Sequence, residues 1–226
     1  MFHRMMFAWS FLAWFAFSPL ASTPLRAAVL DQSYVPPSAP LQWGDIGENG
    51  SGGKAEQAQT FRVGIDGRLI GADLYLTGYG ENLLLEVRRV TADGLPSESS
   101  ADLLGAAIAS PGSLGGVRFV SFDFGPKGPM VAAGETLALV VQSLGRGLYD
   151  WGGNSGDPYP HGGIVARSSV YNDDRWFIPS YPASVSDYGF RTYVEPVPEP
   201  STVLIFAVGG LGAWCIKQRR SNQVPL

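Results

Sequence analysis

Short apolar runs alternate with polar positions through the middle of the chain. In one of them, Leu83, Leu85 and Val87 fall on one side of an extended chain, while Glu86 and Arg88 fall on the other. A period of two is typical of a strand with one buried face. The same kind of pattern predicts strands over residues 57–63, 69–77, 83–90, 103–109, 117–124, 136–143, 164–171 and 188–194.

Turn residues separate these runs. Asp93-Gly94 suits a tight reversal, and glycines fill the segment 110–116. With a first strand inside 31–54 the count reaches roughly nine strands, and no long run has the period of a helix. The pattern predicts an all-β fold over residues 29–196, an antiparallel β-sandwich of jelly-roll type. Residues 150–163 and 171–181 are predicted as loops.

The N-terminal residues have a different character. A short basic start that includes Arg4 leads into an apolar run over 5–17, and small residues follow. This order is typical of a secretory signal peptide, predicted here over residues 1–28. Cleavage could fall after Ser22 or near 27–28. The prediction implies a secretion translocon and a signal peptidase as partners, whereas an uncleaved anchor or a buried helix is the alternative reading.

The C-terminal residues form three consecutive parts. An extended motif with two prolines comes first, an apolar run over 203–216 follows, and a basic cluster ends the run. Prolines bar a helix before Ser201, and the basic cluster should stay on the cytoplasmic side of a membrane. The parts are the motif Val197, Pro198, Glu199, Pro200, Ser201 and Thr202, one short transmembrane helix, and the stop residues Lys217, Arg219 and Arg220.

This tail resembles the PEP-CTERM proteins of Gram-negative bacteria, whose sorting signal has the same three parts in the same order. The resemblance assigns residues 197–220 to the signal and leaves 221–226 as a short trailing segment, which departs from the family pattern. It implies processing by an exosortase, transient anchoring in the inner membrane, and delivery to the cell surface or the exopolysaccharide matrix of a biofilm. An ordinary C-terminal anchor is the alternative.

The middle of the chain is similar to a domain common in exported PEP-CTERM proteins, often called a choice-of-anchor domain. That resemblance implies a β-sandwich, and the family's ligand is generally unassigned. It is carried by the segments Gln59-Thr60-Phe61, Asp73-Leu74-Tyr75-Leu76, Thr91-Ala92-Asp93-Gly94-Leu95-Pro96, Phe122-Asp123-Phe124, Tyr149-Asp150-Trp151-Gly152 and Phe190-Arg191-Thr192-Tyr193.

Composition and charge narrow the possible functions. The 29–196 region holds 19 acidic and 11 basic side chains, a difference of −8, and has no basic stripe. These features argue against nucleic acid as a partner. The single cysteine, Cys215, lies in the apolar tail, so the exported part can form no disulfide and has no catalytic thiol.

Known catalytic arrangements are poorly represented in this region. His161 is its only histidine, and no Gly-x-Ser-x-Gly elbow accompanies it. The adjacent carboxylates Asp173 and Asp174 would point to opposite faces of a strand, which does not suit glycoside hydrolysis. We therefore expect a non-enzymatic protein without a cofactor.

Aromatic and polar side chains gather between residues 150 and 181. Aromatic rings can contact the C–H faces of sugars, while amides and charged groups bind their hydroxyls. The alternative function is thus a carbohydrate-binding module that holds exopolysaccharide through these loops, although the same rings could simply pack beneath the loops. The candidate ligand-binding residues are Trp151, Asn154, Asp157, Tyr159, Tyr171, Arg175, Trp176 and Tyr181.

A calcium ion is a second candidate for the same region. Asp150, Asn154 and Asp157 supply the hard oxygen ligands that calcium prefers, within a glycine-rich segment. Their spacing differs from that of an EF-hand, and solvation of a loop would account for the same residues.

Overall fold

The computed structural model describes residues 27–37, 42–48, 53–156, 158–170, 173–179 and 186–197. Within them the chain is all-β, apart from two short 3-10 turns at Ser100–Asp102 (η1) and Gly125–Lys127 (η2). The predicted signal peptide, the predicted transmembrane run and the trailing segment lie outside these ranges, except for residues 27 and 28. In the described part of the chain, no helix has the length and apolarity that crossing a membrane requires.

In the described ranges, fourteen strands make up the fold. They are β1 (Val29–Tyr34), β2 (Gln42–Glu48), β3 (Lys54–Arg62), β4 (Gly67–Gly80), β5 (Leu83–Arg89), β6 (Leu103–Ala109), β7 (Leu114–Asp123), β8 (Met130–Val131), β9 (Thr136–Ser143), β10 (Gly147–Asn154), β11 (Ile164–Ser168), β12 (Trp176–Phe177), β13 (Asp187–Tyr188) and β14 (Phe190–Pro196).

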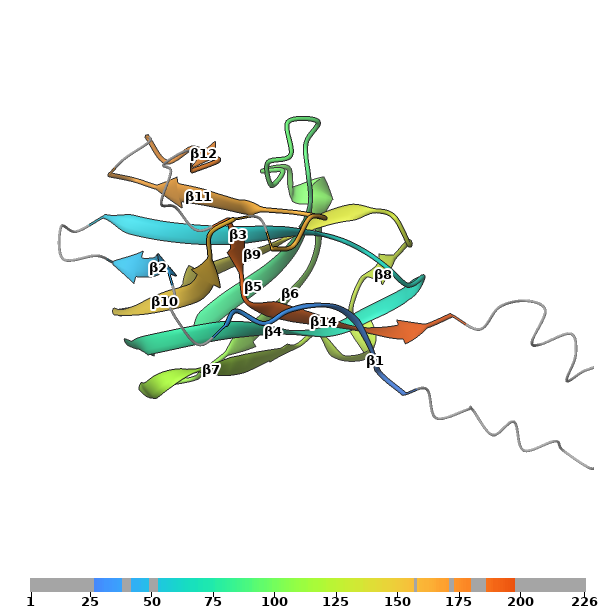
Figure 1. Ribbon diagram of the computed structural model, residues 1–226, viewed down its shortest axis with the longest axis horizontal. Coiled ribbons are helices and arrows are strands. Elements are labelled where there is room, and N and C mark those ends of the chain that lie inside the picture. Colours follow the sequence, from blue (N-terminus) through green and yellow to red (C-terminus); the bar gives the residue numbers. More distant parts are fainter. Residues whose placement is uncertain are drawn as a thin grey trace, which may run out of the picture.

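All of these strands belong to one antiparallel sheet that curls into a half-barrel, so that two layers face each other (Figure 1). One layer contains β11, β3, β9, β5 and β6. In the other layer, the long strand β4 pairs with β7, β8, β10 and β14. Strands β1 and β2 then extend this layer by pairing with β14 and β10. The result is a β-sandwich-like fold, while jelly-roll connectivity stays a prediction.

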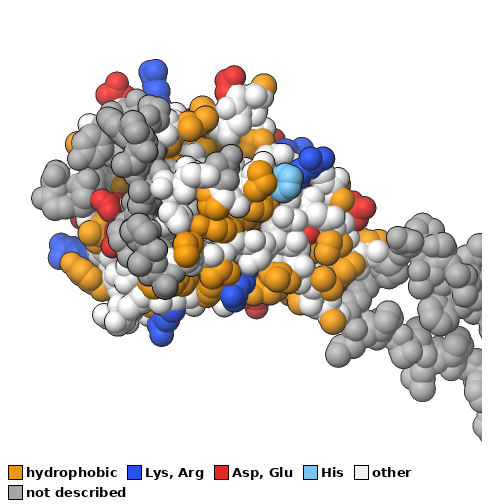
Figure 2. All heavy atoms as spheres, in the orientation of Figure 1, with side chains coloured by type: hydrophobic (Ala, Val, Ile, Leu, Met, Phe, Trp, Pro, Cys, Tyr) orange, Lys and Arg blue, Asp and Glu red, His pale blue; other side chains and the backbone are white. Residues whose placement is uncertain are grey.

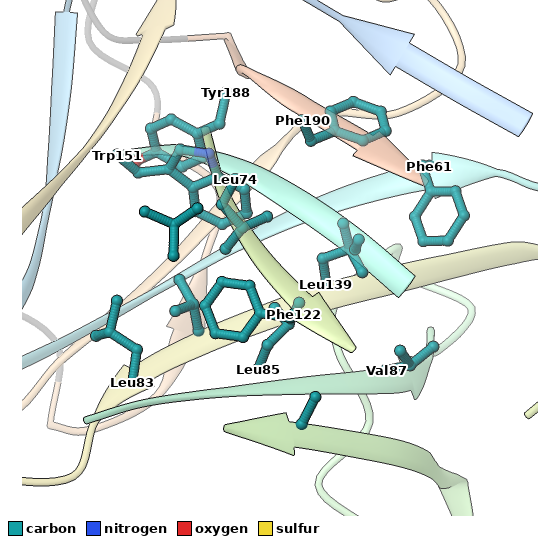
Figure 3. Packing of buried hydrophobic residues seen from close by; sticks show 14 of the residues in the cluster. Phe61, Leu74, Leu83, Leu85, Val87, Phe122, Leu139, Trp151, Tyr188 and Phe190 are labelled. Atoms are coloured by element: carbon teal, nitrogen blue, oxygen red, sulfur yellow. The ribbon is translucent and has the colours of Figure 1, made fainter. Parts of the chain in front are cut away.

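The core lies between the two layers. Leu83, Leu85 and Val87 of β5 are fully buried, as the alternating pattern predicted. They face apolar side chains of the opposite layer, among them Leu74 and Phe122 (Figure 3). Burying one such side chain stabilises a fold by about 1.5–3 kcal/mol, so this apolar interior is the main force that holds the layers together.

Eight of the predicted strands are found, β6 and β9 with the predicted bounds and the other six with shifted bounds, and the largest difference concerns β10. Residues 150–154 were predicted as a loop, but they belong to this strand, which pairs with β4 and β2. Glycines at 147, 152 and 153 weaken the apolar pattern of the segment, and pairing on both edges compensates for their low strand preference. The segment 31–54 likewise holds a second strand, β2, where only one strand was expected.

Candidate functional site

The structure places Trp151 inside the protein. Its side chain is fully buried, and its ring stacks on Tyr188 with 4.7 Å between the centroids (Figure 3). Its Nε1 donates a hydrogen bond of 2.8 Å to the carbonyl oxygen of Gly189. Because both the ring and its polar atom are used within the fold, Trp151 acts as a core residue and does not face a surface ligand.

Tyr159 is also buried, at 7% exposure. Its ring packs edge-on against Phe190 at 5.1 Å, and its hydroxyl donates to Gln32 Oε1 at 2.9 Å. Burial raises the pKa of its hydroxyl to about 12, so the group remains a neutral donor at physiological pH. Tyr159 therefore fixes the loop after β10 to the core.

The calcium candidates are only partly described. Asp150 points away from the core and lies opposite Asp45 of the neighbouring strand β2. Burial, then the hydrogen bond and charge of Asp45, raise the pKa of Asp150 to about 6. Asn154 uses its Oδ1 to accept a hydrogen bond from the backbone of Ser155, while Asp157 lies outside the described residues. Among the residues that the structure describes, no group of three or more His, Cys, Asp or Glu side chains could hold a metal.

The other candidate ligand-binding residues that the structure describes around β12 do not lie beside Trp151 and Tyr159. Trp176 lies half-buried on β12, against the outer face of the sheet, and Arg175 beside it is exposed. Tyr171 and Tyr181 lie outside the described residues. The described aromatic candidates therefore do not form one surface: two of them pack in the interior and one lies on the opposite side of the β11–β3–β9–β5 layer.

The residues considered for catalysis are dispersed at the surface. Asp173 and Asp174 are both exposed, with φ angles of 48° and 59°, in the connection between β11 and β12. His161 is exposed as well, and its ring lies 5.9 Å from that of Tyr159. On the face shown in Figure 2, Lys and Arg side chains are scattered and form no continuous stripe.

A hollow of about 300 Å³ lies on the outer face of β3, β9 and β5, and it was missed by the sequence interpretation. Val140 forms part of its floor, and Trp176 lies at its side. The register places Val140 opposite both Ala58 and Glu86, so charged and apolar residues share this face. Its lining residues are Glu56, Glu86, Arg88, Ser97, Glu98, Val140, Gln142, Arg167 and Trp176.

Two ion pairs form the walls of this hollow. Arg88 Nε donates to Glu86 Oε2 at 2.7 Å, and its Nη1 donates to the carbonyl oxygen of Ser97 at 2.9 Å. Arg167 pairs with Glu56 on the adjacent strand. Burial raises the pKa of Glu56, while the charge and hydrogen bond of Arg167 act in the opposite direction. These pairs hold the polar groups in defined positions.

Arg167 also contacts Trp176, and its guanidinium carbon lies 4.8 Å from the centre of the ring. Its Nε is buried and has no hydrogen-bond partner among the described residues. The nearest acceptor recorded for that atom, Oδ1 of the exposed Asp174, is 3.8 Å away. The sequence indicates this site only through charged residues, such as Glu86 and Arg88, that occupy the outward positions of an otherwise apolar strand.

A second hollow of about 310 Å³ adjoins the first, and both share Glu56 and Gln142. It extends toward two turns, and its lining includes Glu81 of the β4–β5 turn and Arg146 of the β9–β10 turn. The second hollow thus continues from the first to the ends of β2, β3 and β9.

Comparison with known proteins identifies one segment of the chain. Residues 196–220 match the PEP-CTERM protein-sorting motif. This match supports exosortase-dependent sorting of an exported protein, and it covers the tail rather than the β domain. No curated protein and no solved structure matches the chain significantly.

Proposed function

We propose that this chain is a non-enzymatic protein that is exported across the inner membrane, anchored there briefly, processed by an exosortase and delivered to the cell surface or the extracellular matrix. The observation that carries the proposal is the sorting motif at 196–220, which begins at the residue where β14 ends. The folded domain therefore occupies the chain up to the motif and leaves no long linker between them.

The arrangement of the first and last strands supports this proposal. Strand β1 begins at Val29 and pairs with β14, with Val29 opposite Val194. The chain thus enters and leaves the fold at the same end (Figure 1). A leader and a tail that leave from one end can both be held at a membrane while the rest of the domain points away.

The distance between the fold and the apolar run is short. Five residues separate Val197 from the start of the run at 203. An extended chain advances at most about 3.6 Å per residue, so the domain lies within roughly 20 Å of the apolar segment. On this proposal the exosortase acts close to the folded domain.

The test compares the wild type with a variant in which Pro198, Glu199 and Pro200 are all replaced by alanine, both expressed in the natural host. Intact mass and cell fractionation are measured. We expect the wild type to lose the mass of its helix and basic end and to leave the membrane, because the exosortase cuts near the motif. The variant should remain full-length in the membrane fraction.

A matched control carries alanine at Ser221, Asn222 and Gln223, which follow the basic cluster, and it should be processed like the wild type. If the wild type stays uncleaved in the membrane, the tail is a permanent anchor and delivery to the surface or matrix must be abandoned.

A further inference from the structure

The first hollow on the outer sheet face contains mixed charges that nearly cancel. Glu56, Glu86 and Glu98 contribute three carboxylates, and Arg88 and Arg167 contribute two guanidinium groups. The opposite charges are in contact, as in the Arg88–Glu86 and Arg167–Glu56 pairs. An ionic ligand would have to compete with one of these pairs, so the hollow does not favour an acidic polymer, a phosphate or a metal cation.

The same groups suit a ligand that carries many hydroxyls. A hydroxyl donates one hydrogen bond and accepts others, and this hollow offers acceptors and donors side by side. Its carboxylates accept, its guanidinium groups donate, and the amide of Gln142 can do both. Because the ion pairs already hold these groups, a ligand would find them pre-oriented.

Apolar surface lies next to this polar rim. Val140 and Trp176 line the hollow, and both belong to a small apolar cluster on the outside of the sheet. Val140 is almost fully buried at the base of the hollow, so the half-buried indole of Trp176 provides the apolar surface for the C–H groups of a sugar ring. Arg167 lies over the Trp176 ring and restricts its orientation.

From this geometry we propose that the hollow lined by Glu56, Glu86, Arg88, Val140, Arg167 and Trp176 binds an uncharged saccharide. The adjoining hollow, reached past Glu56 and Gln142, gives room for further units of the same chain. The site differs from the one expected in the loop region 150–181, because Trp176 is the only one of the candidate ligand-binding residues named there that lines this hollow. The inference does not depend on how the protein is sorted.

The test uses full-length protein in a detergent whose headgroup contains no sugar, since a sugar headgroup could fill the site. Isothermal titration calorimetry is carried out with uncharged hexasaccharides, namely β-1,4-, β-1,3- and α-1,4-linked glucose and β-1,4-linked mannose. Hexagalacturonate is the acidic comparator, and a chitosan hexamer is the basic one. We expect at least one uncharged hexasaccharide to bind more tightly than either charged comparator.

Two variants connect the binding to this hollow. Trp176→Ala removes the apolar side and should weaken binding about tenfold, which corresponds to about 1.4 kcal/mol. Glu86→Gln keeps the size of the side chain but weakens an acceptor and its ion pair, so binding should fall about three- to tenfold. The matched control is Glu135→Gln, because Glu135 also contacts an arginine, Arg89 at 3.6 Å, but lies outside the hollow.

Far-ultraviolet circular dichroism of each variant shows whether the fold is intact, and Glu86→Gln provides the test if Trp176→Ala does not fold. The proposal is overturned if no uncharged hexasaccharide binds. It is also overturned if binding is unchanged in both hollow variants, or if a charged comparator binds more tightly than every uncharged one.

Discussion

Asp187 Oδ1 accepts a hydrogen bond of 3.0 Å from Gln59 Nε2, although 128 residues separate them along the chain. Both side chains are fully buried. The other oxygen of Asp187 accepts from the backbone nitrogen of Tyr159 at 3.1 Å, and Gln59 Oε1 accepts from that of Tyr188 at 2.7 Å. This network connects β3, β13 and the loop after β10 within the interior.

Replacing Asp187 by alanine should destabilise the protein. The substitution leaves two buried donors, Gln59 Nε2 and the Tyr159 amide, without this carboxylate. We expect the free energy of unfolding to fall by about 1–3 kcal/mol, measured by urea denaturation followed through tryptophan fluorescence. Asp187→Asn retains one acceptor and should have a smaller effect. Equal stability of wild type and Asp187→Ala would contradict the structural role of the network.

Glycine at position 44 is required for close packing. A Cβ there would overlap the hydroxyl of Tyr188, which is fully committed because it donates to Gln57 Oε1 at 2.8 Å. Gly44→Ala should therefore lower the free energy of unfolding by about 1–3 kcal/mol. The control is Gly115→Ala on β7, where an added Cβ meets nothing within 4 Å. That variant should match or slightly exceed the wild type, and a comparable loss in both would refute the prediction.

The pair of Asp45 and Asp150 should make stability depend on pH. The pKa of Asp150 rises from 3.8 to about 6 in the fold, so the folded chain holds this proton more tightly than the unfolded chain. Its favourable contribution is complete below about pH 3.8 and is lost as the pH rises through about 6. At neutral pH the ionised Asp150 therefore destabilises the wild type, first because it is partly buried and second because it lies beside Asp45.

Asp45→Asn removes the neighbouring charge and should relieve part of that penalty. We expect the variant to exceed the wild type by roughly 1 kcal/mol at pH 7.5, a figure reduced for solvent screening because Asp150 is partly exposed. The difference should shrink at pH 4.5, as measured by thermal unfolding at both values. Asp93→Asn, in an exposed turn, is the control. A gain that is the same at both pH values would argue against the pair as its cause.

The contact between the first and last strands can be tested by a disulfide. Val29 and Val194 are register partners in β1 and β14. Directly opposed residues in antiparallel strands have Cα atoms about 4.5–5.5 Å apart, which is within the range of a disulfide. In a Cys215→Ser background, Val29→Cys with Val194→Cys should oxidise and migrate faster on a non-reducing gel.

The control pairs Leu30→Cys with Val194→Cys. Neighbouring residues of a strand point to opposite faces, so this pair should stay reduced. Oxidation of the control but not of the register pair would show that β1 has a different register.

Sequence periodicity predicted the buried positions correctly where a strand has one apolar face and one polar face. Leu83, Leu85 and Val87 all proved to be buried, because alternation directly reflects which face meets the core. The method failed for β10, where Tyr149 and Trp151 are fully buried but lie among glycines and polar residues. Nothing local separates this strand from a loop, since its stability comes from hydrogen bonds to β4 and β2.

For the candidate binding residues, too, the sequence predicted only part of what the structure shows. Aromatic and polar composition drew attention to the segment 150–181, but composition does not distinguish a ring in the core from one at the surface. Trp151 and Trp176 both follow a charged residue in the sequence, and the fold places them on opposite sides of one sheet layer. Glu56, Glu86 and Arg167 had no visible relation until strand pairing brought them together.

The sequence by itself determined the sorting motif, the all-β class and the buried face of an alternating strand such as β5. Each of these is encoded locally, in an order of adjacent residues or in a period of two. Only the tertiary structure decided that β1 lies beside β14, that Asp187 meets Gln59, and that ion pairs surround a hollow on the outer face. Those relationships depend on the register between strands far apart in the chain, and register is selected by the packing and hydrogen bonding of the whole sheet.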